Sequence, residues 1–225
     1  MKIIRILTTV TGLAISAAAL TFAGCSSSGS STYKKSENAA ASLQSSGDAL
    51  VKARAQIDST LASLNNLVNT PAADLTKQYQ AFVKQFSSME SAAKAVNDSA
   101  ASMRAKADNY IATWGTQVAA IQNPELRAAS LDRRAEVSGK LQKLVAEYAG
   151  VSETYKPFQQ SLSDIRQVLG ADLTTKGLDT VKPYVSKATA DSVPLKASLD
   201  KLVADFKTLG SSLLPSGPAA AAAAQ

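Results

Sequence analysis

The sequence predicts an all-α protein, an elongated antiparallel bundle or coiled coil of about four long helices. The 225 residues include 41 alanines against 11 glycines and 7 prolines, so good helix formers greatly outnumber helix breakers. Apolar residues recur at alternating spacings of three and four through most of the chain, which is the period of helices that pack side by side. A strand would need alternation at every second residue, and these segments lack it.

The first 24 residues have the pattern of a lipoprotein signal peptide. A basic start precedes an apolar stretch over residues 6–22, and two small residues lead directly into Cys25. The end of this segment resembles a bacterial lipobox, with Phe22 where leucine is usual. The resemblance implies that the Cys25 thiol receives diacylglycerol and that Cys25 becomes the mature N-terminus. Two alternatives stay open: an ordinary signal peptide followed by an unrelated cysteine, and an uncleaved anchor.

Residues 25–33 are expected to be a flexible tether. Five of the eight residues 26–33 are serine, with one glycine and one threonine among them, a composition typical of flexible linkers. Ser26 directly after the cysteine resembles the outer-membrane sorting pattern of Gram-negative lipoproteins. We therefore expect a protein of the cell envelope that is lipid-anchored to the outer membrane and faces the periplasm.

Residues 34–212 are expected to form the bundle, with helices at about 34–69, 71–122, 124–170 and 175–210. The apolar seam of the second helix runs from Leu75 to Trp114 without a break and then slips. Small seam residues in that helix predict close approach of a neighbour at Ala93, Ala100 and Ala107. The aromatic seam residues are expected in the core: Tyr79, Phe82, Phe86, Tyr110, Trp114, Tyr148, Tyr155 and Phe158.

Capping residues and prolines mark the expected boundaries. Thr70-Pro71 and Asn123-Pro124 each place a capping residue before a proline at the first helical position, and Thr174 can cap the last helix.

The remaining prolines fall inside the expected helices or in the tail. Pro157 interrupts no seam, so we expect a kink there. Pro183 and Pro194 predict a last helix that is either kinked or split near Ser192. Residues 213–225, rich in alanine and proline, show no core-facing pattern and are expected to be disordered.

The composition excludes many kinds of chemistry. The chain has no histidine and one cysteine, which removes histidine-based acid–base catalysis, Cys-His nucleophiles, histidine-ligated metals and internal disulfides. Glycines are scattered, so no phosphate-binding loop is expected. The 24 basic and 18 acidic residues form no block dense enough for nucleic acid. We expect no enzyme, no catalytic residue, no metal and no cofactor.

Three segments of the helical part carry a family resemblance: the Tyr110 and Trp114 pair, residues 123–127 with Ser130 and Arg133, and residues 155–158. Through them the sequence resembles the bacterial family named domain of unknown function 2959, with the better match from about residue 75. The resemblance implies an exported, helical, lipid-anchored protein. It carries over no activity and no catalytic residues.

Three classes of function remain for such a chain. The first expectation is a non-enzymatic envelope lipoprotein, a structural or scaffolding rod anchored to a membrane. The alternatives are a periplasmic binding or adaptor module, which docks a partner protein through its helical faces, and a protein whose bundle end touches the lipid surface. The sequence leaves the oligomeric state open.

The connectivity predicts which end of the rod faces the membrane. Short connections make neighbouring helices antiparallel. The first helix runs outward from the lipidated Cys25, and the second returns. The hairpin between Ile121 and Leu126 is therefore expected at the membrane-proximal end.

The residues around this hairpin admit two interpretations. It follows the seam slip after Trp114 and carries the densest basic group of the chain, Arg127, Arg133 and Arg134. These arginines could rest on anionic head groups. Alternatively they form local ion pairs with the neighbouring acidic residues, and Trp114 belongs to the core.

Overall fold

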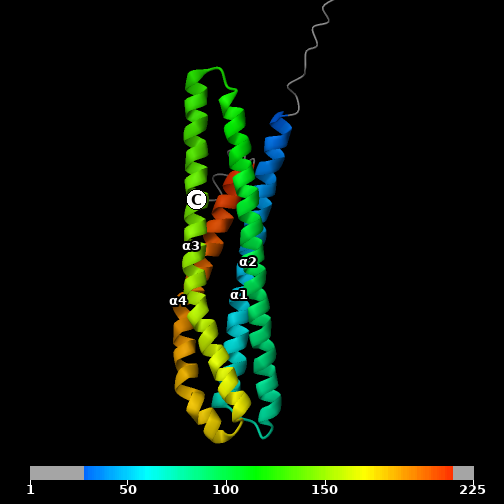
Figure 1. Cartoon of the computed structure of the whole chain (residues 1–225), viewed down its shortest axis with the longest axis vertical. Helices are drawn as coiled ribbons and strands as arrows, with labels where there is room; N and C mark the ends of the chain where they lie inside the picture. The colour runs from blue at the N-terminus through cyan, green and yellow to red at the C-terminus, as the bar shows by residue number, and fades with distance from the viewer. Residues whose placement is uncertain (1–27, 215–225) are drawn as a thin grey trace, which may run out of the picture.

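The computed structural model describes residues 28–214, which form four helices and no strand. Helix α1 covers Ser28–Asn69, α2 covers Leu75–Ala119, α3 covers Pro124–Ala171 and α4 covers Thr175–Leu213. The expected signal peptide, Cys25 and residues 215–225 of the expected tail lie outside the described residues. Leu213, which was expected in the tail, is instead the last residue of α4 and is buried. The helices have 39 to 48 residues, so each is about 60 to 70 Å long. They run antiparallel as one rod (Figure 1), which confirms the predicted fold class.

Each helix packs against its two neighbours around the rod. α1 contacts α2 and α4, and α3 contacts the same two helices, more sparsely on its α2 side. The α2–α3 hairpin and the start of α1 lie at one end, and the other two connections lie at the opposite end (Figure 1). Because α4 ends well short of the hairpin tip, the hairpin projects beyond it (Figure 1).

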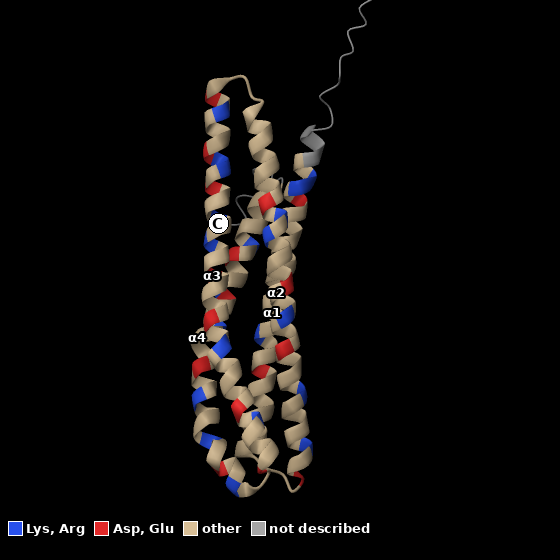
Figure 2. Ribbon diagram, viewed as in Figure 1, with Lys and Arg blue, Asp and Glu red and all other residues tan. Residues whose placement is uncertain are grey.

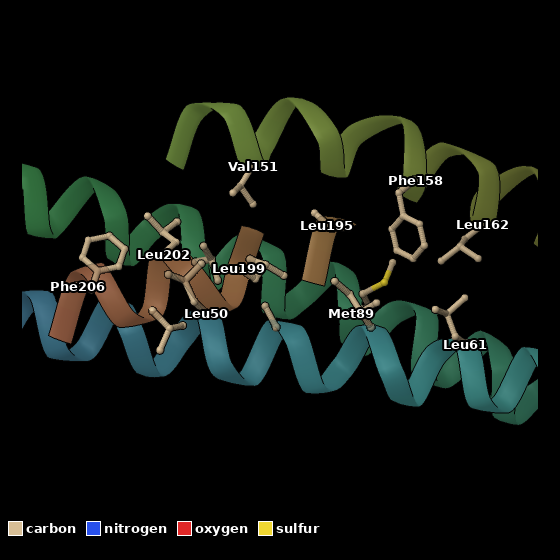
Figure 3. Close-up of a cluster of buried hydrophobic side chains, with 14 of the residues drawn as sticks. Leu50, Leu61, Met89, Val151, Phe158, Leu162, Leu195, Leu199, Leu202 and Phe206 are labelled. Atoms are coloured by element: carbon tan, nitrogen blue, oxygen red, sulfur yellow. The ribbon is translucent and has the colours of Figure 1, made fainter. Parts of the chain in front are cut away.

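The core is one continuous apolar cluster along the rod. Labelled side chains from all four helices converge in Figure 3, among them Leu50, Met89, Phe158 and Leu199. The predicted seams are confirmed because their large apolar positions are buried, including those of the looser first helix. Among the eight seam aromatics, Tyr79, Trp114, Tyr148 and Tyr155 are only partly buried and pack against the cluster.

Two helix starts differ from the prediction. α1 begins at Ser28, so it includes most of the expected tether. Serine costs only a few tenths of a kcal/mol more than alanine in a helix. The segment also leads directly into the part of α1 that packs in the core, beginning near Ala39. α2 begins at Leu75 and Pro71 lies in the connection, because Asp74 accepts hydrogen bonds from two backbone N–H groups of the first turn. Aspartate is a stronger N-cap than threonine.

The other boundary signals are confirmed. The Asn123 side chain accepts a hydrogen bond from the Leu126 N–H at 3.0 Å, with proline at the first helical position. Thr174 caps α4 by accepting from the Gly177 N–H at 3.3 Å.

The prolines inside α3 and α4 end neither helix. Pro157, Pro183 and Pro194 are all exposed, so water can hydrogen bond to the carbonyls that each proline leaves without a donor. α4 is one continuous helix, which excludes the split near Ser192. Figure 1 shows that both α3 and α4 bend along their length, as proline-containing helices do.

Candidate functional site: the α2–α3 hairpin

The α2–α3 hairpin brings together the residues that the sequence suggested for a membrane-proximal tip. Trp114 lies near the end of α2, and Arg127, Arg133 and Arg134 lie in the first three turns of α3. Cys25 lies outside the described residues, so its lipidation stays a prediction.

Trp114 joins the two arms of the hairpin. Its indole N–H donates to the Ser130 hydroxyl of α3 at 3.2 Å. Its ring lies 5.5 Å from the Tyr110 ring, centroid to centroid. The side chain is half-buried and packs against the core cluster, so its ring contributes to the α2–α3 contact.

Two of the three arginines bind backbone carbonyls, one within α2 and one in the connection that follows it. Arg127 Nε donates to the Ile121 carbonyl at 2.8 Å, and Arg134 Nε donates to the Ile111 carbonyl at 2.9 Å. Arg127 binds just beyond the C-terminal end of α2, where carbonyls carry partial negative charge and a cation is favourable. Ile111 lies inside the helix, eight residues before its end. Gly115 lets Arg134 approach, because a Cβ there would lie only 3.1 Å from the guanidinium. Each of these bonds uses one of the five guanidinium donors.

Arg133 forms a local ion pair. Glu136 accepts from Arg133 Nη1 at 2.6 Å and from Lys140 Nζ at 2.6 Å. Hydrogen bonds from Lys140 and then Arg133 lower the pKa of Glu136 to about 2. Within residues 28–214, neither Glu125 nor Asp132 forms an ion pair. The ion-pair interpretation therefore describes only one of the three arginines.

The two arms of the hairpin differ in charge. Residues 109–122, which cover the end of α2 and the start of the connection, contain no charged side chain. Residues 125–143 of α3 carry five basic and three acidic side chains. Figure 2 shows the uncharged arm beside the charged one. Near the turn, Leu126 and Leu131 are 60% and 45% exposed. Our sequence reasoning missed the uncharged arm, although counting charges along the second helix would have found it.

The loosely packed contact between α2 and α3 leaves a chain of adjoining hollows. The largest, with a volume of about 400 Å³, lies between residues 103–111 of α2 and 138–149 of α3. A second of about 280 Å³ shares Met103, Arg104 and Val145 with it. A third of about 60 Å³ reaches the centre of the bundle. We call the largest hollow the α2–α3 groove; it is lined by Met103, Ala107 and Ile111 of α2 and by Leu141, Val145 and Ala149 of α3.

The hollows correct one expectation about packing. Ala93, Ala100 and Ala107 predicted close approach of a neighbouring helix, but each of them lines one of the three hollows. Opposite the groove, α3 also presents short side chains, Ala146 and Ala149. Larger α3 residues such as Val145 and Tyr148 line the hollows too, so the space remains because α2 and α3 stay apart along this contact.

The innermost hollow is bordered by a buried hydroxyl. Tyr155 lines it, and its hydroxyl oxygen is buried without a hydrogen-bond partner in the described part of the chain. Burial, and to a lesser extent the charge of Glu90, raises the pKa of Tyr155 to about 12. The neighbouring Tyr148 hydroxyl differs, because it hydrogen bonds with Asn97.

We expect Tyr155→Phe to stabilise the protein by about 1 kcal/mol, because it removes a buried polar group that has no partner. The midpoint of thermal unfolding should rise by about 2 to 4 °C. Tyr148→Phe is the matched control and should lower the midpoint slightly, since it removes a hydrogen bond. A loss of stability in Tyr155→Phe equal to that of the control would contradict this prediction.

The described residues offer neither a metal cluster nor a membrane span. No group of three histidine, cysteine, aspartate or glutamate side chains within residues 28–214 could hold a metal ion. None of the four helices is long and apolar enough to cross a bilayer.

Ion pairs between helices connect α4 to α1 and α3. Examples are Arg54–Asp200 at 2.7 Å and Lys201–Glu147 at 2.6 Å.

The fold defines the class of the protein, an all-α chain built as a single long antiparallel four-helix bundle. The chain belongs to the family DUF2959, described as a protein of unknown function, whose model matches residues 27–209. This match confirms the family resemblance and extends from the start of α1 almost to the end of α4. Comparison with curated proteins and with solved structures finds no match.

Proposed function

We propose that the protein is a non-enzymatic lipoprotein of the cell envelope. In this proposal a helical rod is anchored to the outer membrane through lipidated Cys25 and stands in the periplasm with its α2–α3 hairpin toward the lipid.

One observation carries the proposal: the start of α1 and the hairpin tip lie at the same end, and the tip extends beyond the first residue of α1 (Figure 1). Only Ser26 and Ser27 separate Cys25 from α1. Three residue steps span at most about 11 Å. An acylated Cys25 would therefore hold the hairpin tip at the membrane surface.

The chemistry of the tip supports the same orientation. Exposed Leu126 and the uncharged arm of α2 can approach lipid without desolvating a charge. Arg127, Arg133 and Arg134 can each contribute about 1 kcal/mol near anionic head groups. The adaptor alternative, in which a helical face docks a partner, is favoured by a separate observation, the open groove between α2 and α3.

A fluorescence-quenching experiment tests the orientation. Because Cys25 is the only cysteine and would be acylated, an engineered cysteine is the only free thiol. We would label Gln122→Cys at the tip and Ala72→Cys at the opposite end with a small fluorophore, in lipidated protein reconstituted into vesicles that carry a head-group quencher. Both positions are exposed.

The label at residue 122 should be quenched strongly and the label at residue 72 hardly at all. The two sites are separated by the length of α2, 45 residues or about 68 Å. Equal quenching at both positions, or stronger quenching at residue 72, would overturn the proposed orientation.

A further inference from the structure

We propose that the α2–α3 groove binds one long acyl chain that carries an anionic head group, with the head group toward the hairpin tip. The binding itself needs no anchor; the inference rests on the proposed function only for the membrane as the source of the acyl chain.

The lining of the groove fits a single hydrocarbon chain. Met103, Ala107 and Leu141 form a buried floor, and Ile111 and Val145 are half-buried walls. The rims are exposed and polar: Arg104 and Asp108 on α2, and Gln142 on α3. A narrow apolar floor between polar rims can bury the methylene groups of one acyl chain while the rims stay hydrated.

The dimensions of the groove agree with this occupant. Along α3 it extends over residues 138–149, about 16 Å at 1.5 Å per residue. The hydrocarbon core of a bilayer is about 30 Å thick, so an acyl chain in one leaflet spans about 15 Å. The volume of about 400 Å³ lies within the usual range of small-molecule sites. A partner helix, about 10 Å wide, would have to cover the charged rim as well.

The charge at the two ends of the groove sets the direction of the ligand. The end toward the tip, at Ile111 and Ser138, adjoins Arg134, whose Nε binds the Ile111 carbonyl. Within residues 28–214 Arg134 forms no ion pair: Oδ2 of Asp108 lies 3.9 Å from Nε of Arg104, and Glu136 binds Arg133 and Lys140. Asp132 lies about 200° around α3 from Arg134. The remaining donors of Arg134 can therefore meet an anionic head group.

At the opposite end of the groove, the cation Arg104 lies on the exposed rim, where its Nε is 3.9 Å from Oδ2 of Asp108. Between the rims the groove continues past Val145 toward Asn97 and Tyr148, which are uncharged and hydrogen bonded to each other. The apolar end of a ligand fits there.

The test is a titration with parinaric acid, a long-chain fatty acid that becomes fluorescent in apolar sites. The protein is the full chain carrying Cys25→Ala, so that its own acyl groups cannot occupy the groove. We expect saturable binding of one molecule per chain. Ala146→Trp should weaken binding at least tenfold, because exposed Ala146 lines the groove and an indole there would fill it.

Two further variants make the test specific. Ala105→Trp is the matched control and should bind as wild type, since Ala105 is exposed on α2 and lies about 200° around the helix from the floor residues Met103 and Ala107. Arg134→Gln should remove the preference for parinaric acid over its uncharged methyl ester.

Three binding results would overturn the inference. They are the absence of saturable binding, equal affinity of Ala146→Trp and wild type, and equal affinity of wild type for the acid and the ester. Sedimentation that shows a dimer abolished by Ala146→Trp would also overturn it, because a second copy of the chain would then occupy the groove.

Discussion

Cys25→Ala should abolish incorporation of radiolabelled palmitate and move the protein from the membrane fraction to the soluble periplasmic fraction. Stable anchoring takes two acyl chains or an equivalent pair of signals, and this variant would lose both chains together. No helix of residues 28–214 can span the membrane in their place. The tip arginines, at about 1 kcal/mol each, could hold only a small share of the protein at the surface.

Ser26→Ala is the matched control, because it changes the neighbouring residue and leaves the thiol in place. It should label with palmitate as wild type does. Equal labelling of wild type and Cys25→Ala, or no labelling of either, would show that Cys25 is not the anchor. A wild-type chain whose intact mass still includes the first 24 residues would support the uncleaved-anchor alternative instead.

The periodic features of the fold could be predicted from the sequence because each is local. Seam residues three and four apart lie on one face of a helix whatever its neighbours are, and the caps at Asn123 and Thr174 depend on the next three residues. The start of α2 was placed wrongly because two cap signals compete within five residues. Asp74 provides the cap, and Pro71, which could have opened the helix, lies in the connection.

The residues of the hairpin could be predicted, but their bonds could not. Antiparallel connectivity places Trp114 and the arginines at one end. The bond from Arg134 to the Ile111 carbonyl requires in addition that Gly115 lie directly opposite, which depends on how α2 and α3 are rotated.

The α2–α3 groove could not be predicted from the sequence either. Alanines on a seam predict close packing when large residues face them. Here Val145 and Tyr148 of α3 face them, but α2 and α3 stay apart while α1 and α4 pack against the other sides of the two helices. The resulting space depends on the separation of α2 and α3, which no local pattern of residues determines.

Leu144→Asp should destabilise the bundle by at least about 3 kcal/mol. Leu144 is 3% exposed on the core seam of α3, so the change forfeits about 2 kcal/mol of apolar burial. It also places a carboxylate in the core, where the protein must desolvate the charge or keep the group protonated. Domains are stable by only about 5 to 15 kcal/mol, so this loss is a large share of the total.

The adjacent residue provides the control for this change. Lys143 has a side chain that is 71% exposed, and its only ion pair within the described chain is a long one of 3.9 Å with Glu147. Lys143→Asp should therefore cost at most about 1 kcal/mol. Thermal unfolding followed by far-ultraviolet circular dichroism should show a midpoint lowered by about 6 to 12 °C for Leu144→Asp, with a much smaller change for Lys143→Asp. Equal shifts would mean that α3 does not face the core through Leu144, and the rotation of α3 that also forms the groove and positions Arg134 would then be wrong.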